Sequence, residues 1–209
     1  TVSPVVQNKK STLYYIDFSG TEFELGGSAF FQSLNRIGSK APAVKSAQYF
    51  ATAFNAVQGL VDGGLLLAAH DVSAGGLLTT LLEMTFANVN GGLDISLDGF
   101  DCADVVKILF AENPALVIQV AGNECAKVEQ LLAKQDVKFI SLGQPSDERT
   151  LTVSKDGAEH MFFIDYLRDV WYKSSYLLDC KQSGEKCAKA RFENYKKQPL
   201  RYRLPQGFT

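Results

Sequence analysis

The stretch LLLAAHDVSAGGLLTTLLEMTFA, residues 65–87, decides the fold class. It begins with a short continuous apolar run, residues 65–69, which is typical of a strand buried on both faces of a sheet. The run breaks into the polar segment HDVSAGG, residues 70–76, which we call the elbow. Apolar residues at helical spacing then predict a helix from about residue 77 to residue 88. The stretch therefore predicts a strand, a turn with two glycines, and a helix.

The elbow is a candidate phosphate-binding site. Open α/β sheets place ligands at the carboxyl ends of strands, and the first amides of a helix carry partial positive charge and lack partners within the helix. Gly75 and Gly76 would let the backbone approach a ligand closely. Asp71 would hold Mg²⁺, which prefers one or two protein carboxylates together with phosphate oxygens and water. Ser73 would donate its hydroxyl to a phosphate oxygen.

Each residue of the elbow also has a purely structural interpretation. Asp71 or Ser73 is suited to cap the helix that follows. His70 is suited to a hydrogen bond with the backbone of a turn, and Gly75 and Gly76 to close packing of a helix on the sheet. The segment matches neither the Walker pattern GxxxxGK[ST] nor the dinucleotide pattern GxGxxG. The pattern alone therefore indicates phosphate binding and no particular nucleotide fold.

The segments on both sides of this stretch alternate between predicted strands and helices. Further strands are expected at residues 13–18, 93–96, 115–120, 137–142, 151–153 and 158–164, the last at a sheet edge. Further helices are expected at residues 28–37, with Ser28 as the N-cap, and at residues 43–61, 102–110, 123–134 and 166–178. The alternation predicts an α/β (α+β) layer architecture. The hairpin-like spacing of the last three strands predicts a mixed β-sheet flanked by helices.

The chain has 209 residues, of which 46% are hydrophobic and 21% charged, as in an ordinary globular protein. This length fits one large domain with a smaller appendage. We expect a linker at residues 1–12, an α/β domain at residues 13–165, and a helical extension with a basic, polar tail at residues 166–209. The polar start without Met suggests a chain cut from a longer protein, and the tail suggests an arm that packs on a neighbouring domain.

Charge and composition argue against several classes of partner. The net charge of −2 is not the basic footprint of a protein that binds nucleic acid. No apolar run is long enough to span a bilayer, and no signal segment opens the chain, so we expect a cytoplasmic protein with no membrane partner. The four cysteines form no CxxC pair, so free thiols are expected and a structural zinc is not.

Four motifs resemble formylglycinamide ribonucleotide amidotransferases, also called phosphoribosylformylglycinamidine synthases. The most specific pairs HDVSAGGL with LEMTFA, residues 70–77 and 82–87, and resembles the family's HDxSxGGL and LEMAFA segments. The others are LGGSA at residues 25–29, LFAE with VIQV at residues 109–112 and 117–120, and LRDVW at residues 167–171. In the family, the LRxxW helix precedes the glutaminase domain.

The resemblance implies a fragment of a purine-biosynthesis ligase. Members of this family convert formylglycinamide ribonucleotide to the amidine, using ATP and ammonia released from glutamine. The chain resembles the carboxy-terminal α/β half of the second of two modules similar to aminoimidazole ribonucleotide (AIR) synthase. This implies ATP/ADP and Mg²⁺ as cofactors, with Asp71 as the magnesium ligand and Ser73 as a nucleotide contact. The implied partners are the AIR-synthase-like amino-terminal lobe and the glutaminase domain of the same enzyme.

The chain also departs from the family pattern. Val72 and Ala74 stand where many large-form members have Arg and Asp, and ENP at residues 112–114 replaces Glu-Glu. Glu112 and Glu83 therefore receive no role beyond structure. No cysteine lies in the glutaminase motif Gly-x-Cys-Asn-Gly, so we expect no catalytic residue, no glutaminase activity, and an inactive fragment.

Two alternatives to a catalytic nucleotide site remain open. The first is a non-catalytic lobe whose auxiliary nucleotide is a structural support, since a ligand bound only by the folded state stabilises that state. The second is another ATP-dependent enzyme of the AIR synthase superfamily, such as a relative of selenophosphate synthetase or thiamine-phosphate kinase. The LRDVW helix and the basic tail disfavour the second alternative.

Overall fold

The computed structural model describes residues 1–197 and divides the chain into two compact units, Thr1–Leu167 and Arg168–Thr209. The extended arm that we predicted at the end of the tail lies outside the described residues. No helix among residues 1–197 is long and apolar enough to cross a membrane.

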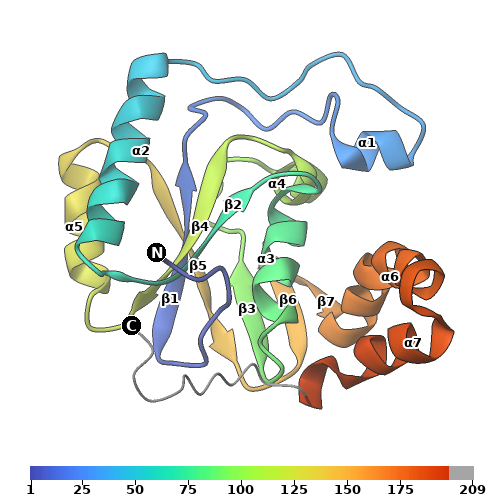
Figure 1. Cartoon of the computed structure of the whole chain (residues 1–209). Coiled ribbons are helices and arrows are strands. Elements are labelled where there is room, and N and C mark those ends of the chain that lie inside the picture. Colours follow the sequence, from blue (N-terminus) through green and yellow to red (C-terminus); the bar gives the residue numbers. More distant parts are fainter. Residues whose placement is uncertain (198–209) are drawn as a thin grey trace. The chain divides into compact units, whose positions relative to one another are not determined.

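The first unit is built on a seven-stranded sheet with the strand order β2-β4-β1-β5-β3-β6-β7 (Figure 1). Neighbouring strands pair antiparallel, except that β3 and β6 are parallel. The predicted mixed sheet is therefore confirmed, as is the predicted edge position of the last strand. The strands are β1 (Ser11–Asp17), β2 (Leu66–Val72), β3 (Gly92–Ser96), β4 (Ala115–Ala121), β5 (Phe139–Ser146), β6 (Thr150–Lys155) and β7 (Ala158–Phe163).

Helices cover both faces of this sheet (Figure 1). On the central strand β1, Tyr14 and Ile16 contribute to one buried cluster with α2 and α5, whereas Leu13 and Tyr15 contribute to a second with α3 and α4. This alternation is the period-two pattern of a strand with a core on each side. The helices are α1 (Ala29–Ser33), α2 (Ala47–Asp62), α3 (Gly76–Phe86), α4 (Val105–Phe110) and α5 (Cys125–Lys134).

The strand β2 corrects one prediction. We expected residues 65–69 to form a strand buried on both faces, but β2 lies at the edge of the sheet with β4 as its neighbour. Within β2 only Ala68 and Val72 are buried. An edge strand has no neighbouring strand on one side, so several of its residues stay partly exposed. Helices still cover part of its two faces, which favours apolar residues in an edge strand as well.

Local signals set the helix ends. Ser28 caps α1 as predicted, because its hydroxyl accepts a hydrogen bond from the amide of Phe31. The helix ends at Ser33, four residues earlier than predicted, and the chain then turns through Asn35 at φ 55°. Ser46 caps α2 in the same way, so that helix begins at Ala47 and not at residue 43.

The segment before β1, which we expected to be a linker, lies against the rest of the first unit. Val6 is buried, and its amide donates to the carbonyl of Met84. Gln7 and Gln119 exchange two hydrogen bonds, since the Gln7 amide donates to the Gln119 side chain and the Gln119 side chain donates to the Gln7 carbonyl.

The helix α6 (Ile164–Ser183) carries the chain into the second unit, followed by α7 (Glu185–Asn194) and the short 3₁₀ helix η1 (Tyr195–Lys197). Within that unit the buried guanidinium of Arg168 lies over three aromatic rings, at 3.8 Å from the nearest ring centre, that of Tyr195. It also donates to the carbonyl of Phe192. Arg168 therefore links α6 to α7 and η1.

Candidate functional site

The elbow places Asp71 and Ser73 at the surface of the first unit. Asp71 is the penultimate residue of β2, and its side chain is 73% exposed. Ser73, just after β2, is also exposed. The register pairs Asp71 with Leu116 and Val72 with Ala115, so the elbow lies beside the start of β4. Both predicted ligand residues are thus accessible from one edge of the sheet.

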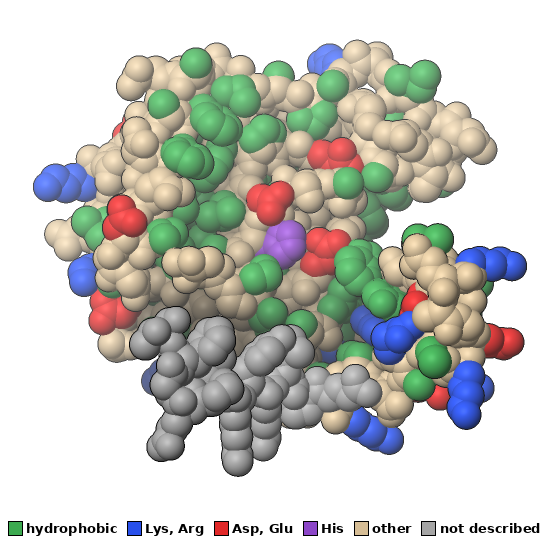
Figure 2. Space-filling view, viewed as in Figure 1, with side chains coloured by type: hydrophobic (Ala, Val, Ile, Leu, Met, Phe, Trp, Pro, Cys, Tyr) green, Lys and Arg blue, Asp and Glu red, His purple; other side chains and the backbone are tan. Residues whose placement is uncertain are grey.

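His70 is held by groups of the chain itself. Its Nδ1 lies 2.8 Å from the backbone oxygen of Asp71 and 3.5 Å from the Asp71 carboxylate. Its Nε2 lies 3.4 Å from the carboxylate of Glu83, on α3. Figure 2 shows a histidine on this face with acidic side chains beside it. His70 therefore joins β2 to α3, which agrees with its structural interpretation and gives Glu83 a contact.

Gly75 and Gly76 are required by conformation and packing. Their φ angles are 89° and 70°, in the left-handed region that favours glycine. A Cβ on Gly76 would lie 2.6 Å from the backbone oxygen of Leu109, and one on Gly75 would lie 2.2 Å from Oγ1 of Thr79. Gly76 therefore does allow close packing of α3, as predicted, but its close contact is with the backbone of α4 and not with the sheet.

The amides of these two glycines are already engaged within the chain. The Gly76 amide donates to the carbonyl of Ser73 at 2.9 Å. The Gly75 amide donates to Oε1 of Glu112 at 2.9 Å, and the same oxygen accepts the amide of Ala29 at 2.8 Å. Sequence reasoning missed this role of Glu112, because nothing in the local pattern pairs it with residues so far away along the chain.

A metal ion would find few protein ligands here. Among residues 1–197, no group of three or more His, Cys, Asp or Glu side chains is placed to hold a metal. Asp71 offers one exposed carboxylate, and Mg²⁺ accepts one or two carboxylates when phosphate and water complete its shell. The residues present therefore fit magnesium carried by a phosphate-bearing ligand and do not fit an all-protein metal cage.

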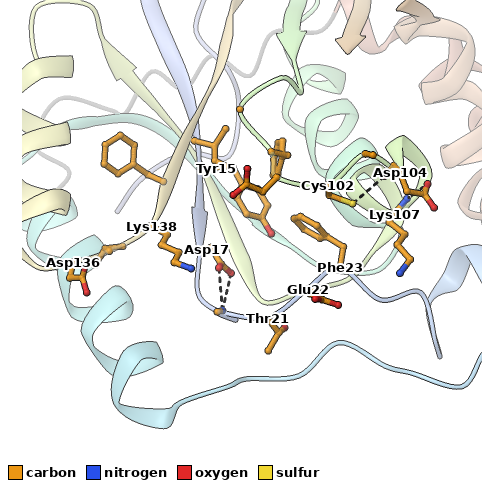
Figure 3. A pocket seen from close by; sticks show the side chains of 18 of the residues that line it. Tyr15, Asp17, Thr21, Glu22, Phe23, Cys102, Asp104, Lys107, Asp136 and Lys138 are labelled. Carbon is orange, nitrogen blue, oxygen red and sulfur yellow. Dashed lines mark hydrogen bonds between the residues drawn. The ribbon is translucent and has the colours of Figure 1, made fainter. Parts of the chain in front are cut away.

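A cavity of about 1100 Å³ lies apart from the elbow. Its lining includes the aromatic trio Tyr15, Phe23 and Phe100, whose rings contact one another. Figure 3 shows Lys138 on one side of it and Lys107 on the other. The predicted site residues Asp71, Ser73, Gly75 and Gly76 do not line it. Sequence reasoning missed this cavity, since strands, helices and loops distant in the sequence line it together.

Burial keeps the aromatic wall of this cavity neutral. Desolvation raises the pKa of Tyr15 far above its ordinary value, with a further contribution from the negative charge of Asp17. The Asp17 carboxylate itself accepts hydrogen bonds from the Ser19 amide and hydroxyl and from the Gly20 amide. Asp17 therefore shapes the loop after β1.

The comparisons with known proteins agree with the four motifs. A protein of Arabidopsis thaliana named probable phosphoribosylformylglycinamidine synthase, chloroplastic/mitochondrial, is 32% identical over 186 residues, which are 88% of this chain and 13% of that protein. Phosphoribosylformylglycinamidine synthase of Homo sapiens is 33% identical over 193 residues, which are 90% of this chain and 14% of that protein. The chain therefore spans only a small part of the length of these curated relatives.

A solved structure and a family model extend this result. The structure described as T. maritima PurL complexed with ATP superposes with a TM-score of 0.63 at 16% identity, covering 80% of this chain and 27% of that one, which shows a shared fold. Residues 19–156 match the family model described as AIR synthase related protein, C-terminal domain. Because this match covers more than half of the sequence, the chain belongs to the family of AIR synthase related proteins, through their C-terminal domain.

Proposed function

We propose that this chain is a nucleotide-binding lobe of a phosphoribosylformylglycinamidine synthase, an ATP-dependent C–N ligase of purine biosynthesis that takes its ammonia from glutamine. The observation that carries the proposal is the exposure of Asp71 and Ser73 on an elbow between strand and helix. The names of the relatives at 32% and 33% identity support the reaction. The AIR-synthase-like amino-terminal lobe and the glutaminase domain would supply the remaining parts, so the lobe alone is inactive.

In this proposal the side chains of the elbow meet the ligand. The Asp71 carboxylate takes one position in the shell of a Mg²⁺ ion that the phosphates of ATP or ADP also bind. The Ser73 hydroxyl donates to a phosphate oxygen, a charge-assisted hydrogen bond. Gly75 and Gly76 contribute the left-handed turn that follows these two residues and leads into α3. The Gly75 and Gly76 amides, which donate within the chain, contribute to the shape of the site.

A second candidate function is to hold a nucleotide that stabilises the fold and takes no part in the reaction. It is favoured by the engagement of His70, whose two ring nitrogens both face polar groups of the chain. The elbow then offers ligands for an ion and a phosphate. A trapped nucleotide would stabilise the folded state by a free energy that rises with the logarithm of its affinity.

Replacing Asp71 by Asn in the full-length protein tests both candidates. The assays are metal content, thermal stability, and the rate of amidine formation from formylglycinamide ribonucleotide, ATP and glutamine. A matched control is Asp94→Asn, which changes another exposed strand carboxylate, on β3. A catalytic site predicts a collapse of the rate at unchanged stability, whereas a structural site predicts lost magnesium and lower stability at a near-normal rate per molecule. If neither property changes, the assignment of Asp71 to magnesium is wrong.

A further inference from the structure

Glu112 joins two segments that are distant in the sequence. Its Oε1 accepts the amide of Ala29, the first residue of α1, at 2.8 Å and the amide of Gly75, just before α3, at 2.9 Å. Both amides are the unpaired donors that helix starts present. Hydrogen bonds from amides to a carboxylate are charge-assisted and stronger than neutral ones. One side chain therefore satisfies both donors.

Among residues 1–197, Glu112 is the acceptor recorded for both amides. Gly75 is the N-cap of α3 and has no side chain with which to cap it. In α1 the Ser28 side chain accepts from Phe31 and donates to Leu25, so it does not serve the Ala29 amide. Glu112 takes the place of a capping side chain at both positions, and it comes from a third segment, immediately after α4.

This arrangement bears on where a phosphate can lie. An anion that accepted the Gly75 amide would lie within hydrogen-bond distance of the Glu112 carboxylate, where two negative charges repel. The side chains of Asp71 and Ser73 are exposed to solvent, and the proposed function assigns them to the ligand. The glycine amide is therefore closed to phosphate while Glu112 is in place.

We propose that Glu112 is a positioning residue of the nucleotide site: its carboxylate fixes the elbow against the start of α1, so that a phosphate-bearing ligand meets Asp71 and Ser73 and not the Gly75 amide. The inference rests on the proposed function for its ligand. The contact that it invokes, between Glu112 and the two amides, is independent of any ligand.

Two variants test the positioning role. Glu112→Gln keeps an oxygen that accepts both amides and removes the charge, whereas Glu112→Ala removes the acceptor; Glu159→Ala, at an exposed position of β7, is the matched control. The probe is Mg-ADP, titrated calorimetrically into the full-length protein. We expect Glu112→Ala to lower the affinity at least tenfold and Glu112→Gln to stay within threefold of wild type. Tighter binding to either variant would overturn the proposal, because it would mean that Glu112 competes with the phosphate.

A spectroscopic measurement separates this inference from the proposed function. In the ¹⁵N-labelled 209-residue chain, the amide proton signals of Ala29 and Gly75 should both move upfield in Glu112→Ala and remain in place in Glu159→Ala. If the Gly75 amide signal does not move, Glu112 does not position the elbow, whether or not the protein binds nucleotide. If both amides respond and the wild-type full-length protein binds no Mg-ADP, the Glu112 contact stands and the proposed function is refuted.

Discussion

Replacing Gly76 by Ala should destabilise the first unit more than an ordinary glycine substitution does. Gly76 begins α3 with a φ of +70°. A Cβ at this position would lie 2.6 Å from the backbone oxygen of Leu109 and 2.8 Å from backbone carbons of Phe110. Neither of these contacts is with the flexible end of a side chain, so α3 and α4 would have to move apart.

The magnitude has two parts. Holding an L-residue in the left-handed region costs about 1–2 kcal/mol, and forcing extra volume into a packed core typically costs about 1–3 kcal/mol. The sum for Gly76→Ala is therefore about 2–5 kcal/mol of the free energy of unfolding. Gly64 provides the matched control: its φ is +64°, and a Cβ there would meet nothing within 4 Å. Gly64→Ala should cost only the conformational part, about 1–2 kcal/mol.

The assay is equilibrium unfolding of both variants in urea, monitored by circular dichroism, with the free energy extrapolated to water. The slopes should match that of wild type, so that the difference in midpoint reports stability. Equal losses in the two variants would refute the argument, because the close approach of α3 to α4 would then contribute nothing beyond backbone strain.

Three further predictions concern the same two units. Burial raises the pKa of Tyr15 in the folded state, so the folded protein keeps a proton that the unfolded chain loses above pH about 10. Stability should therefore fall with rising pH there by about 1.4 kcal/mol per pH unit, and urea midpoints between pH 8 and 11 that stay level would contradict this. Asn113→Ala should lower the free energy of unfolding in urea by about 1–3 kcal/mol, since the buried amide donates to three acceptors in the loop after β1. The control Asn123→Ala, at an exposed site, should change it little. Arg168→Lys should lower the stability of the second unit by about 1–2 kcal/mol, because contacts with aromatic rings are lost. Amide hydrogen exchange in α7 should become faster, and an unchanged rate would contradict this prediction.

The sequence predicted those features that depend on neighbouring residues. Ser28 was identified as a cap because a hydroxyl before a helix accepts an amide three residues later, which is a local interaction. The strand and helix on either side of the elbow follow from the change in apolar spacing near residue 70. The antiparallel pair of β6 and β7 followed from the short spacing of the last strands, whereas the parallel pair of β3 and β6 has no such local signal.

The features that escaped prediction depend on residues far apart in the chain. The edge position of β2 is set by its pairing with β4, and a half-covered edge strand has the same apolar composition as a central one. The role of Glu112 needs partners 83 and 37 residues away, at Ala29 and Gly75. The separate cavity is lined by segments of strands, helices and loops that meet only when the sheet is assembled.

The elbow shows why a strand, two glycines and a helix predict an anion without identifying it. The amides at the start of a buried helix need acceptors whether or not a ligand is present, because an unpaired buried donor is costly. A protein that met this need only with its ligand would have a poorly ordered elbow in the ligand-free state. In this chain Glu112 meets the need from within, at both α1 and α3. The elbow can therefore keep its shape without a ligand, and in the proposed function the specificity for a phosphate-bound metal would rest on the two exposed side chains, Asp71 and Ser73.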